Sequence, residues 1–352
     1  MQVSISFHRD AITDWDALTT YALEAERMGV TTAWTAEAWA HDAATPLAYL
    51  AAKTERIRLG SGIFQIGTRT PALVGMTALT LDSMSNGRFV LGLGTSGPQV
   101  IEGWHGVPFD RPIRRTRELI EIVRMVLRGQ VVAYEGDIHE LPLSNGEGKA
   151  LRSGAPTAEN LPIYVASLGP KNLELTGELA DGWLAASFIP EQGHVFFDSI
   201  RKGAERVGRT LDDIELQAGG GVQFTDDIDS VMEARKRGLA FSLGAMGSRQ
   251  NNFYNAAYRR QGFADEAAEI QKLYLDGKRD EARALVPDEM VRLTSIVGTE
   301  EQVADRIRAY RDAGVNTLRV DPHGATLEER LETLGKTMDI VNAVSAETAT
   351  QV

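Results

Sequence analysis

Short apolar, β-branched runs alternate along this chain with longer segments in which apolar residues recur every three to four positions. The eight runs are Val3–Phe7, Thr32–Thr35, Ile57–Phe64, Phe89–Leu93, Ile163–Ala166, Gly182–Ala185, Ile214–Phe224 and Thr317–Val320. Runs of this kind are typical of buried strands, and the segments between them have helical periodicity. Eight strand–helix units over 352 residues predict an α/β fold, a single-domain (β/α)8 (TIM) barrel spanning residues 1–352.

The strand–helix alternation is interrupted in three places. Residues 129–141 carry Glu135-Gly136-Asp137 between β-prone segments and predict a hairpin, and residues 144–160 are rich in the residues of surface loops. The largest interruption, residues 230–287, lies between the seventh and eighth predicted strands and has a mostly helical pattern. It predicts a helical insertion that could act as a lid over the barrel mouth; the alternative is a set of helices packed on the outside.

Composition narrows the class of ligand. The chain has 37 Lys and Arg against 49 Asp and Glu, a net charge of −12, which is unfavourable for binding nucleic acid or an anionic membrane surface. It has no cysteine, and its six histidines are scattered, so we expect neither disulfides nor a metal site. The start of the chain does not resemble a signal peptide, and no apolar run approaches the roughly 20 residues of a membrane span. We therefore expect a cytoplasmic protein that acts on a small molecule.

The residues that follow the second predicted strand are the first candidates for catalysis, because barrels of this kind carry their chemistry at the carboxyl ends of the strands. Glu37, Trp39 and His41 lie together there. A carboxylate beside an indole is partly desolvated, which suits it to proton transfer. The alternative is that Trp39 covers the barrel rim and that Glu37 pairs with a nearby arginine. His8 ends the first strand and is a further candidate, although a lone histidine is more often a structural hydrogen-bonding residue.

Glycines mark the third and fourth predicted strands. Gly60 and Gly62 interrupt the third, which indicates either close approach of a flat ligand or relief of crowding inside the barrel. The fourth strand ends in Thr95, Ser96 and Gly97. Free backbone amides and two hydroxyls suit an oxygen-rich ligand such as a polyol chain or a phosphate, whereas an ordinary glycine-rich turn is the alternative.

The fifth predicted strand leads into an anion-binding pattern. The strand ends at Ala166, and a short turn follows at Ser167, Leu168 and Gly169. A predicted helix comes next, with Lys171 close to its start. The amide groups at a helix N-terminus bind anions, and Lys171 adds a positive charge. A helix start without a ligand is the alternative.

These segments together resemble a known family. EAERMGVTTAWTAEAW, RTPALVGMTALTLDSMSNGRFVLGLGTSGPQVIEGWHG and LPIYVASLGPKNLELTGELADGW, with the later FYNAAYRRQGF, resemble the luciferase-like monooxygenase superfamily between Val3 and Val320. Within it the chain is similar to the oxidoreductases that use the deazaflavin coenzyme F420, and to methylenetetrahydromethanopterin reductases in particular. The resemblance implies an insertion-bearing barrel that forms a homodimer and binds F420, with FMN as the alternative.

The resemblance also implies a layout for the site. The ring would lie against a bulge at Gly62-Ile63, where a non-proline cis peptide often occurs, and the turns at residues 95–97 and 166–169 would hold the side chain and phosphate. Hydride would pass between C5 of the ring and an activated C=C, C=N or C=O of a small organic substrate. Trp39 would wall the substrate side, and the proton would come from Glu37, His8 or Glu102.

This chain departs from parts of the family pattern. Many relatives have Asp-His after the second strand, where this chain has Glu37-Ala38, and the sugar-phosphate dehydrogenases have a glutamate where this chain has Gly97-Pro98. These departures argue against sugar-phosphate oxidation. Two other interpretations remain open: an FMN-dependent monooxygenase supplied with reduced flavin, and a flavin- or deazaflavin-binding protein without turnover.

Overall fold

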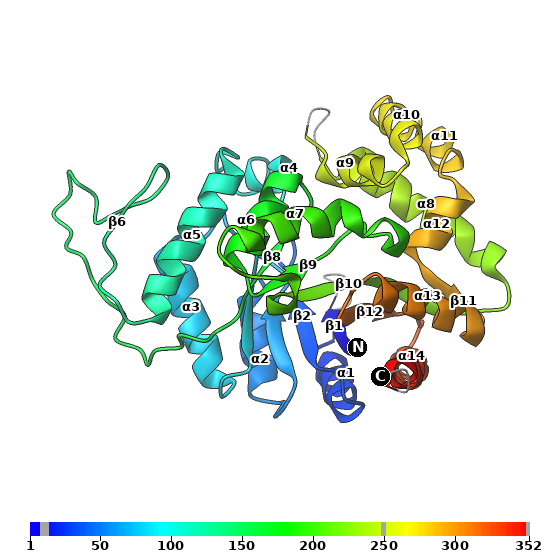
Figure 1. The fold of residues 1–352 in the computed structure, drawn as a ribbon, viewed down its shortest axis with the longest axis horizontal. Helices are drawn as coiled ribbons and strands as arrows, with labels where there is room; N and C mark the ends of the chain where they lie inside the picture. The colour runs from blue at the N-terminus through cyan, green and yellow to red at the C-terminus, as the bar shows by residue number, and fades with distance from the viewer. Residues whose placement is uncertain (8–13, 248–250, 350–352) are drawn as a thin grey trace.

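Eight parallel strands close into a barrel in the computed structural model, which describes residues 1–7, 14–247 and 251–349 (Figure 1). The barrel strands, in spatial order, are β1 (Gln2–Phe7), β2 (Thr32–Thr35), β3 (Arg58–Ser61), β5 (Phe89–Gly94), β8 (Ile163–Ala166), β9 (Gly182–Leu184), β10 (Glu215–Phe224) and β12 (Thr317–Pro322). Every neighbouring pair is parallel, and β12 pairs with β1 to close the ring. The predicted (β/α)8 barrel is confirmed.

Helices surround the barrel because each carries one apolar face that must be buried against the strands. The α-helices in the described parts of the chain are α1 (Trp15–Arg27), α2 (Ala44–Ala51), α3 (Pro71–Met84), α4 (Pro98–Ile101), α5 (Pro112–Leu127), α6 (Pro170–Leu179), α7 (His194–Glu205), α8 (Ile228–Ala245), α9 (Phe253–Arg260), α10 (Ala264–Leu275), α11 (Arg279–Ala284), α12 (Asp288–Thr294), α13 (Glu300–Asp312) and α14 (Leu327–Ala349). Pro71 occupies the first turn of α3, as its missing N–H and fixed φ allow. Short 3₁₀ turns precede α7 and β10, at Pro190–Gln192 and Leu211–Asp213.

Alternate residues of each strand face opposite sides of the barrel wall. On β12, Leu318 and Val320 belong to the main apolar core between strands and helices. The interior holds a smaller cluster that includes Trp34 and Tyr164. The Trp34 Nε1–H group donates to the Gln217 side chain at 3.1 Å, so the indole is held in one orientation across the barrel.

The glycines of the third and fourth strands relieve crowding inside the barrel. A Cβ on Gly60 would lie 2.2 Å from the Trp34 ring, and a Cβ on Gly92 would lie 1.9 Å from the Ser61 carbonyl oxygen. Both distances are far inside van der Waals contact, so no larger residue fits unless the wall moves. For Gly60 and Gly92 the packing of Trp34 and of the third strand is therefore sufficient explanation.

The third predicted strand is split into two. β3 ends at Ser61, and a second short strand, β4 (Phe64–Gln65), pairs with β5 farther along. Between them lies a cis peptide bond at Gly62-Ile63, at the position implied by the family resemblance.

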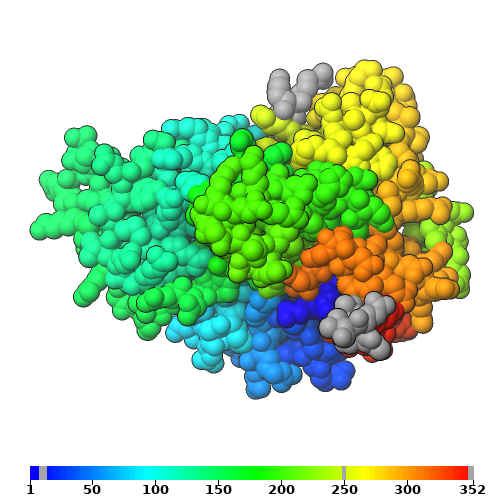
Figure 2. All heavy atoms as spheres, viewed as in Figure 1, coloured from blue at the N-terminus to red at the C-terminus, as the bar shows by residue number. Residues whose placement is uncertain are grey.

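The interruptions of the alternation project from the barrel. β6 (Tyr134–Glu135) and β7 (Glu140–Leu141) form the predicted antiparallel hairpin, and residues 144–160 carry no helix or strand. Figure 2 shows this region extending at one end of the molecule, and α9–α11 gathered above the opposite side. The structure adds one strand that the pattern did not predict, β11 (Ile296–Gly298), which pairs with the end of β10.

Two further features bear on ligands. None of the described helices is long and apolar enough to span a membrane. Residues 1–7, 14–247 and 251–349 contain no group of three or more His, Cys, Asp or Glu that could hold a metal ion.

Candidate active site

A cavity of about 490 Å³ opens at the carboxyl ends of the barrel strands, where this fold places its chemistry. Its wall is built from the segments after β2, β3, β5, β8 and β9, and from α8 and α9. The candidate residues on the wall are Glu37, Trp39, Gly62, Ile63, Thr95, Ser96, Gly97, Ala166, Ser167, Leu168, Gly169 and Lys171. Five separate turns thus converge on one cavity, and the catalytic and binding roles of these residues remain predictions.

Of the other candidates for proton transfer, one is not described and two lie away from the cavity wall. His8 falls outside the described residues. The His41 ring packs edge-on against Trp15 with the ring centroids 5.5 Å apart, and neither His41 nor Glu102 lines the cavity. The Glu102 carboxylate instead accepts a hydrogen bond from the Phe109 amide at 3.1 Å.

Glu37 lies on the cavity wall, but its carboxylate is fully engaged by the protein. Arg69 donates to both oxygens, from Nε at 2.9 Å and from Nη2 at 2.7 Å. The backbone amides of Gln65 and Ala43 donate as well, at 3.0 and 3.3 Å. The Arg69 guanidinium in turn lies over the Phe64 ring, 4.4 Å from its centroid.

This set of contacts favours the second of the two interpretations of Glu37. The two oxygens of Glu37 accept four hydrogen bonds, two of them from Arg69, so the carboxylate is committed to the protein and not to a ligand in the cavity. Through Gln65 and Arg69 it ties the end of β2 to β4 and to the start of α3. Glu37 therefore fixes the shape of the wall that contains Gly62 and Ile63.

The turn after β8 presents backbone groups to the cavity. The Ser167 hydroxyl is turned away and bonds to Thr176 at 2.8 Å, and the Ser167 carbonyl accepts from the Trp183 indole. α6 starts at Gly169 without a side-chain cap, and nothing lies within 4 Å of where a Cβ of Gly169 would be. Pro170 has no N–H, and the amides of Asn172 and Leu173 donate to the Gly169 carbonyl at 3.0 and 2.9 Å, so the Lys171 amide is the one left for an anionic ligand in this first turn.

Lys171 contributes less positive charge to the turn after β8 than the sequence suggests. Its side chain is 74% exposed, and its Nζ lies 3.7 Å from the carboxylate of Glu174. Hydrogen bonds from Lys202 and Arg206 to Glu174 lower the pKa of that carboxyl to about 2. Lys171 is therefore partly neutralised by Glu174.

Arg260, at the end of α9, supplies a positive charge that the sequence reasoning missed. Its Nη2 donates to the Leu168 carbonyl at 2.6 Å, and its Nε is buried without a hydrogen-bond partner. No carboxylate in the described parts of the chain lies within ion-pair distance of it, and burial lowers the pKa of its guanidinium. The segment FYNAAYRRQGF contains this residue, but only the fold brings it to the end of β8.

Part of the cavity wall is apolar and aromatic. α8 and α9 contribute residues that were not predicted as site residues: Phe241, Ala245, Met246, Phe253 and Tyr254. Trp39 faces the same cavity from the end of β2 and is 42% exposed. The cavity wall thus combines the backbone of the turns after β5 and β8 with apolar and aromatic side chains of α8 and α9.

Comparison with known sequences shows which proteins this chain is similar to. The sequence model of the family described as luciferase-like monooxygenase matches residues 2–317. A Mycobacterium tuberculosis protein named "Putative coenzyme F420-dependent oxidoreductase" is 41% identical over 304 residues, covering 84% of this chain and 88% of its own. The 5,10-methylenetetrahydromethanopterin reductase of Archaeoglobus fulgidus is 29% identical over 296 residues, covering 82% and 84%.

A solved structure agrees with the sequence comparisons. The coenzyme F420-dependent tetrahydromethanopterin reductase of Methanopyrus kandleri superposes with a TM-score of 0.78 at 27% identity, covering 95% of this chain and 97% of its own. The fold and the family predicted from the sequence are thereby confirmed. The chain belongs to the luciferase-like monooxygenase family of oxidoreductases.

Proposed function

We propose that this protein is an F420-dependent oxidoreductase that acts on a small, largely apolar organic substrate. The observation that carries the proposal is the make-up of the cavity wall, which joins the turns after β5 and β8 to aromatic side chains of α8 and α9, with the Arg260 guanidinium bonded to the Leu168 carbonyl. The 41% identical relative named for F420 and the structural similarity to an F420-dependent reductase support the same cofactor.

The anionic part of F420 would bind at the β8 end. The Lys171 amide and the backbone of residues 95–97 and 166–169 would hold its phosphate and side chain, with the Arg260 charge behind the turn. This chain has a net charge of −12, so the attraction must be local to that end. The wall at Gly62 and Ile63 would face the ring.

When bound, the deazaflavin would supply hydride transfer between its C5 carbon and an activated C=C, C=N or C=O. The protein's own contribution is orientation and exclusion of water. The Glu37–Arg69 pair keeps the wall at β3 and β4 in place, and Trp39 bounds the substrate end. The helical insertion, residues 230–287, would act as a lid, because α8 and the adjoining α9 already contribute Phe241 and Phe253 to the cavity.

The homodimer belongs to the same proposal. Leu73, Met76 and Met84 lie on one face of α3 and are 46%, 57% and 46% exposed. Large apolar side chains that share one exposed helix face are typical of a protein–protein contact. A second copy of this chain would cover them.

Equilibrium binding tests the cofactor directly. Purified apo-protein is titrated with F420 and with FMN side by side, with fluorescence quenching as the readout. Tight binding of F420 and weak binding of FMN is the expected result. Preference for FMN would instead favour a monooxygenase, which an oxygen-uptake assay with reduced FMN would test, and binding of neither would refute the proposed cavity function.

Turnover separates an enzyme from a binding protein. Reduced F420 is mixed with enone, imine and pterin compounds, and its oxidation is followed by absorbance. Tight F420 binding without turnover on any of them would point to a deazaflavin-binding protein without chemistry.

A further inference from the structure

α9 places a phenol on the wall of the cavity. Tyr254 lines the same cavity as Gly62, Ile63 and Trp39. The residue is half-buried, its hydroxyl makes no hydrogen bond to any described residue, and that hydroxyl is not among the oxygens sealed from solvent. This hydroxyl is therefore available to a ligand in the cavity.

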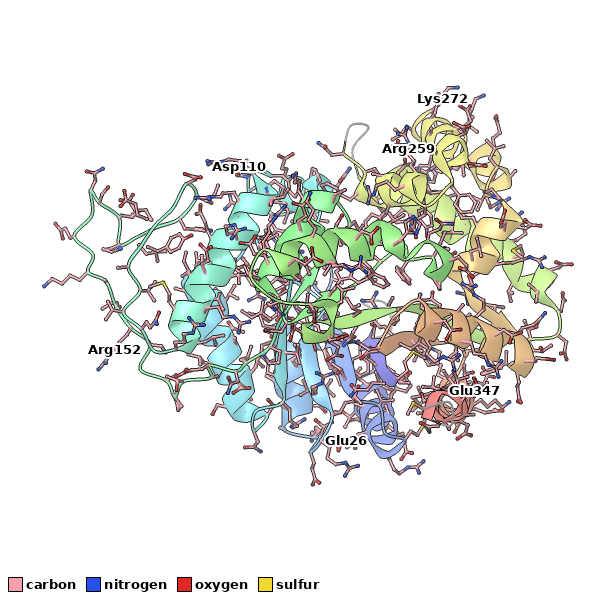
Figure 3. All side chains as sticks on the ribbon, in the orientation of Figure 1. Glu26, Asp110, Arg152, Arg259, Lys272 and Glu347 are labelled. Carbon is pink, nitrogen blue, oxygen red and sulfur yellow. The ribbon has the colours of Figure 1, made fainter. Side chains whose placement is uncertain are left out.

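Two buried asparagines hold Tyr254 in position. The Asn252 side chain caps α9 by accepting from the Asn255 amide at 3.0 Å, and it donates to the Leu243 carbonyl at 2.8 Å. The Asn255 side chain donates to the carbonyls of Leu243 and Ala267. These bonds tie the first turn of α9 to α8 and α10, so the phenol is presented by a rigid support. In Figure 3, Arg259 and Lys272 mark the outer side of α9 and α10.

Arg319 lies inside the barrel mouth behind this wall. It alternates on β12 with the outward-facing Leu318 and Val320, so its side chain enters the barrel interior. Its Nη2 donates to the carbonyl of Ala185, and the next residue, Ala186, lines the cavity. Among the residues that the structure describes, no carboxylate pairs with it within 4.0 Å.

Arg319 holds the carbonyl next to Ala186, and Ala186 and Tyr254 line the same cavity. Burial raises the pKa of Tyr254, and the positive charge of Arg319 opposes that rise. Burial lowers the pKa of Arg319, and Tyr254, Tyr310 and Asp321 oppose that fall. Tyr254 is thus protonated at neutral pH, with a cation at hand to stabilise the phenolate.

Among the residues that the structure describes, the other ionisable side chains of the cavity wall are less suited to give a proton. The Glu37 carboxylate is engaged by Arg69 and two backbone amides, and Lys171 is 74% exposed and lies beside Glu174. A phenol without a partner, on a rigid helix and next to a cation, matches what a general acid requires.

We propose that Tyr254 donates the proton to the oxygen of a carbonyl or conjugated carbonyl substrate and that Arg319 stabilises the resulting phenolate. The proposal rests on the proposed function for the hydride. The hydride adds to the carbonyl carbon or to the β-carbon of an enone, and the π electrons move onto oxygen. The Tyr254 O–H bond then breaks, the proton joins that oxygen, and the phenolate regains a proton from solvent. An enol formed in this way tautomerises to the saturated ketone.

A binding experiment tests the hydrogen bond without turnover. Benzylideneacetone labelled with ¹³C at its carbonyl is titrated into wild-type protein, Tyr254→Phe and the matched control Tyr49→Phe, and the bound carbonyl stretch is read by difference Raman spectroscopy. Tyr49 lies on α2 and does not line the cavity. We expect a shift to lower frequency in wild type and Tyr49→Phe, absent in Tyr254→Phe, with affinity for the probe reduced about 3- to 10-fold.

The same proteins are titrated with F420 and assayed for reduction of the probe by reduced F420. Tyr254→Phe should keep its F420 affinity and lose about 10²- to 10⁴-fold in kcat, together with the alkaline limb of the pH profile. Arg319→Lys keeps the positive charge. It should shift the pH of the alkaline limb and lower kcat less than Tyr254→Phe does. An unshifted carbonyl in wild type, no probe binding, or equal shifts in wild type and Tyr254→Phe would overturn the assignment. Failure of F420 binding with an intact Raman shift would overturn only the proposed function.

Discussion

Replacing Glu37 with glutamine separates a wall-fixing role from a proton-donating role. The substitution keeps the size of the side chain but removes the charge that Arg69 contacts through Nε and Nη2 at 2.9 and 2.7 Å. The Glu37 and Arg69 side chains are only 10% and 18% exposed. Water can therefore replace the lost contacts only in part, and the guanidinium is left without its partner.

The magnitude follows from these contacts. A hydrogen bond to a charged group contributes about 1.5–3 kcal/mol, and breaking a fully buried ion pair costs about 3–5 kcal/mol. Since this pair is not fully buried, and the amide oxygen can still accept one hydrogen bond, we expect Glu37→Gln to lower the free energy of unfolding by about 2–4 kcal/mol. Arg69→Gln should cost a similar amount, and the double variant should show a coupling of about 1–3 kcal/mol.

Urea unfolding of the four proteins in this cycle measures the coupling. The control is Glu269→Gln, which breaks the ion pair to Lys272, whose side chain is 63% exposed and lies at the outer edge of α10 (Figure 3). That variant should lose at most about 1 kcal/mol. If Glu37→Gln matched this control in stability but lost 10²–10⁴ in turnover while Arg69→Gln stayed active, Glu37 would be the proton donor and our reasoning would be refuted.

Four shorter predictions accompany this one. Gly92→Ala should lower the midpoint of thermal unfolding or prevent soluble expression, because the added Cβ would lie 1.9 Å from the Ser61 carbonyl oxygen; an unchanged midpoint would contradict the packing argument. Glu174→Gln should make the free energy of unfolding depend less on pH in acid. The pKa of this carboxyl falls from 4.5 to about 2 on folding, so the stability that it contributes is present above pH 4.5 and is lost as pH falls toward 2. Acid titrations of wild type and variant, followed by circular dichroism, would show the difference. Arg260→Gln should weaken F420 binding about 3- to 30-fold in fluorescence titrations, and an unchanged affinity would remove Arg260 from the anion-binding end. Met76→Glu should convert a dimer to a monomer in light scattering, unless the exposed face of α3 lies outside the interface.

The barrel could be predicted from the sequence because its signals are local. Strands buried on both faces read as continuous apolar runs, and helices with one buried face repeat every 3.6 residues. The ends of β2 and β8 were predicted to the residue. The third strand was not, because its break at Gly62-Ile63 depends on contacts with β2 and β5 that have no pattern of their own along the chain.

For the candidate site, the sequence likewise predicts positions but not roles. The position of a turn after a barrel strand is enough to place Glu37, Ser96 and Leu168 at one cavity, because parallel strands all end at the same mouth. What each side chain does there depends on its neighbours. Only the folded structure shows that Arg69 saturates the Glu37 carboxylate and that the Ser167 hydroxyl points away.

By itself, the sequence determined the barrel, the family and the turns that meet at the cavity, because these follow from local periodicity and from the order of strands. The tertiary structure alone decided that α9 brings Tyr254 to that cavity and Arg260 to the turn after β8, and that Arg319 lies behind the cavity wall. These residues are separated from the predicted turns by 60 residues or more of chain. Charge, burial and hydrogen bonding between such distant segments exist only once the chain has folded, and they set which group holds a ligand and which group can give a proton.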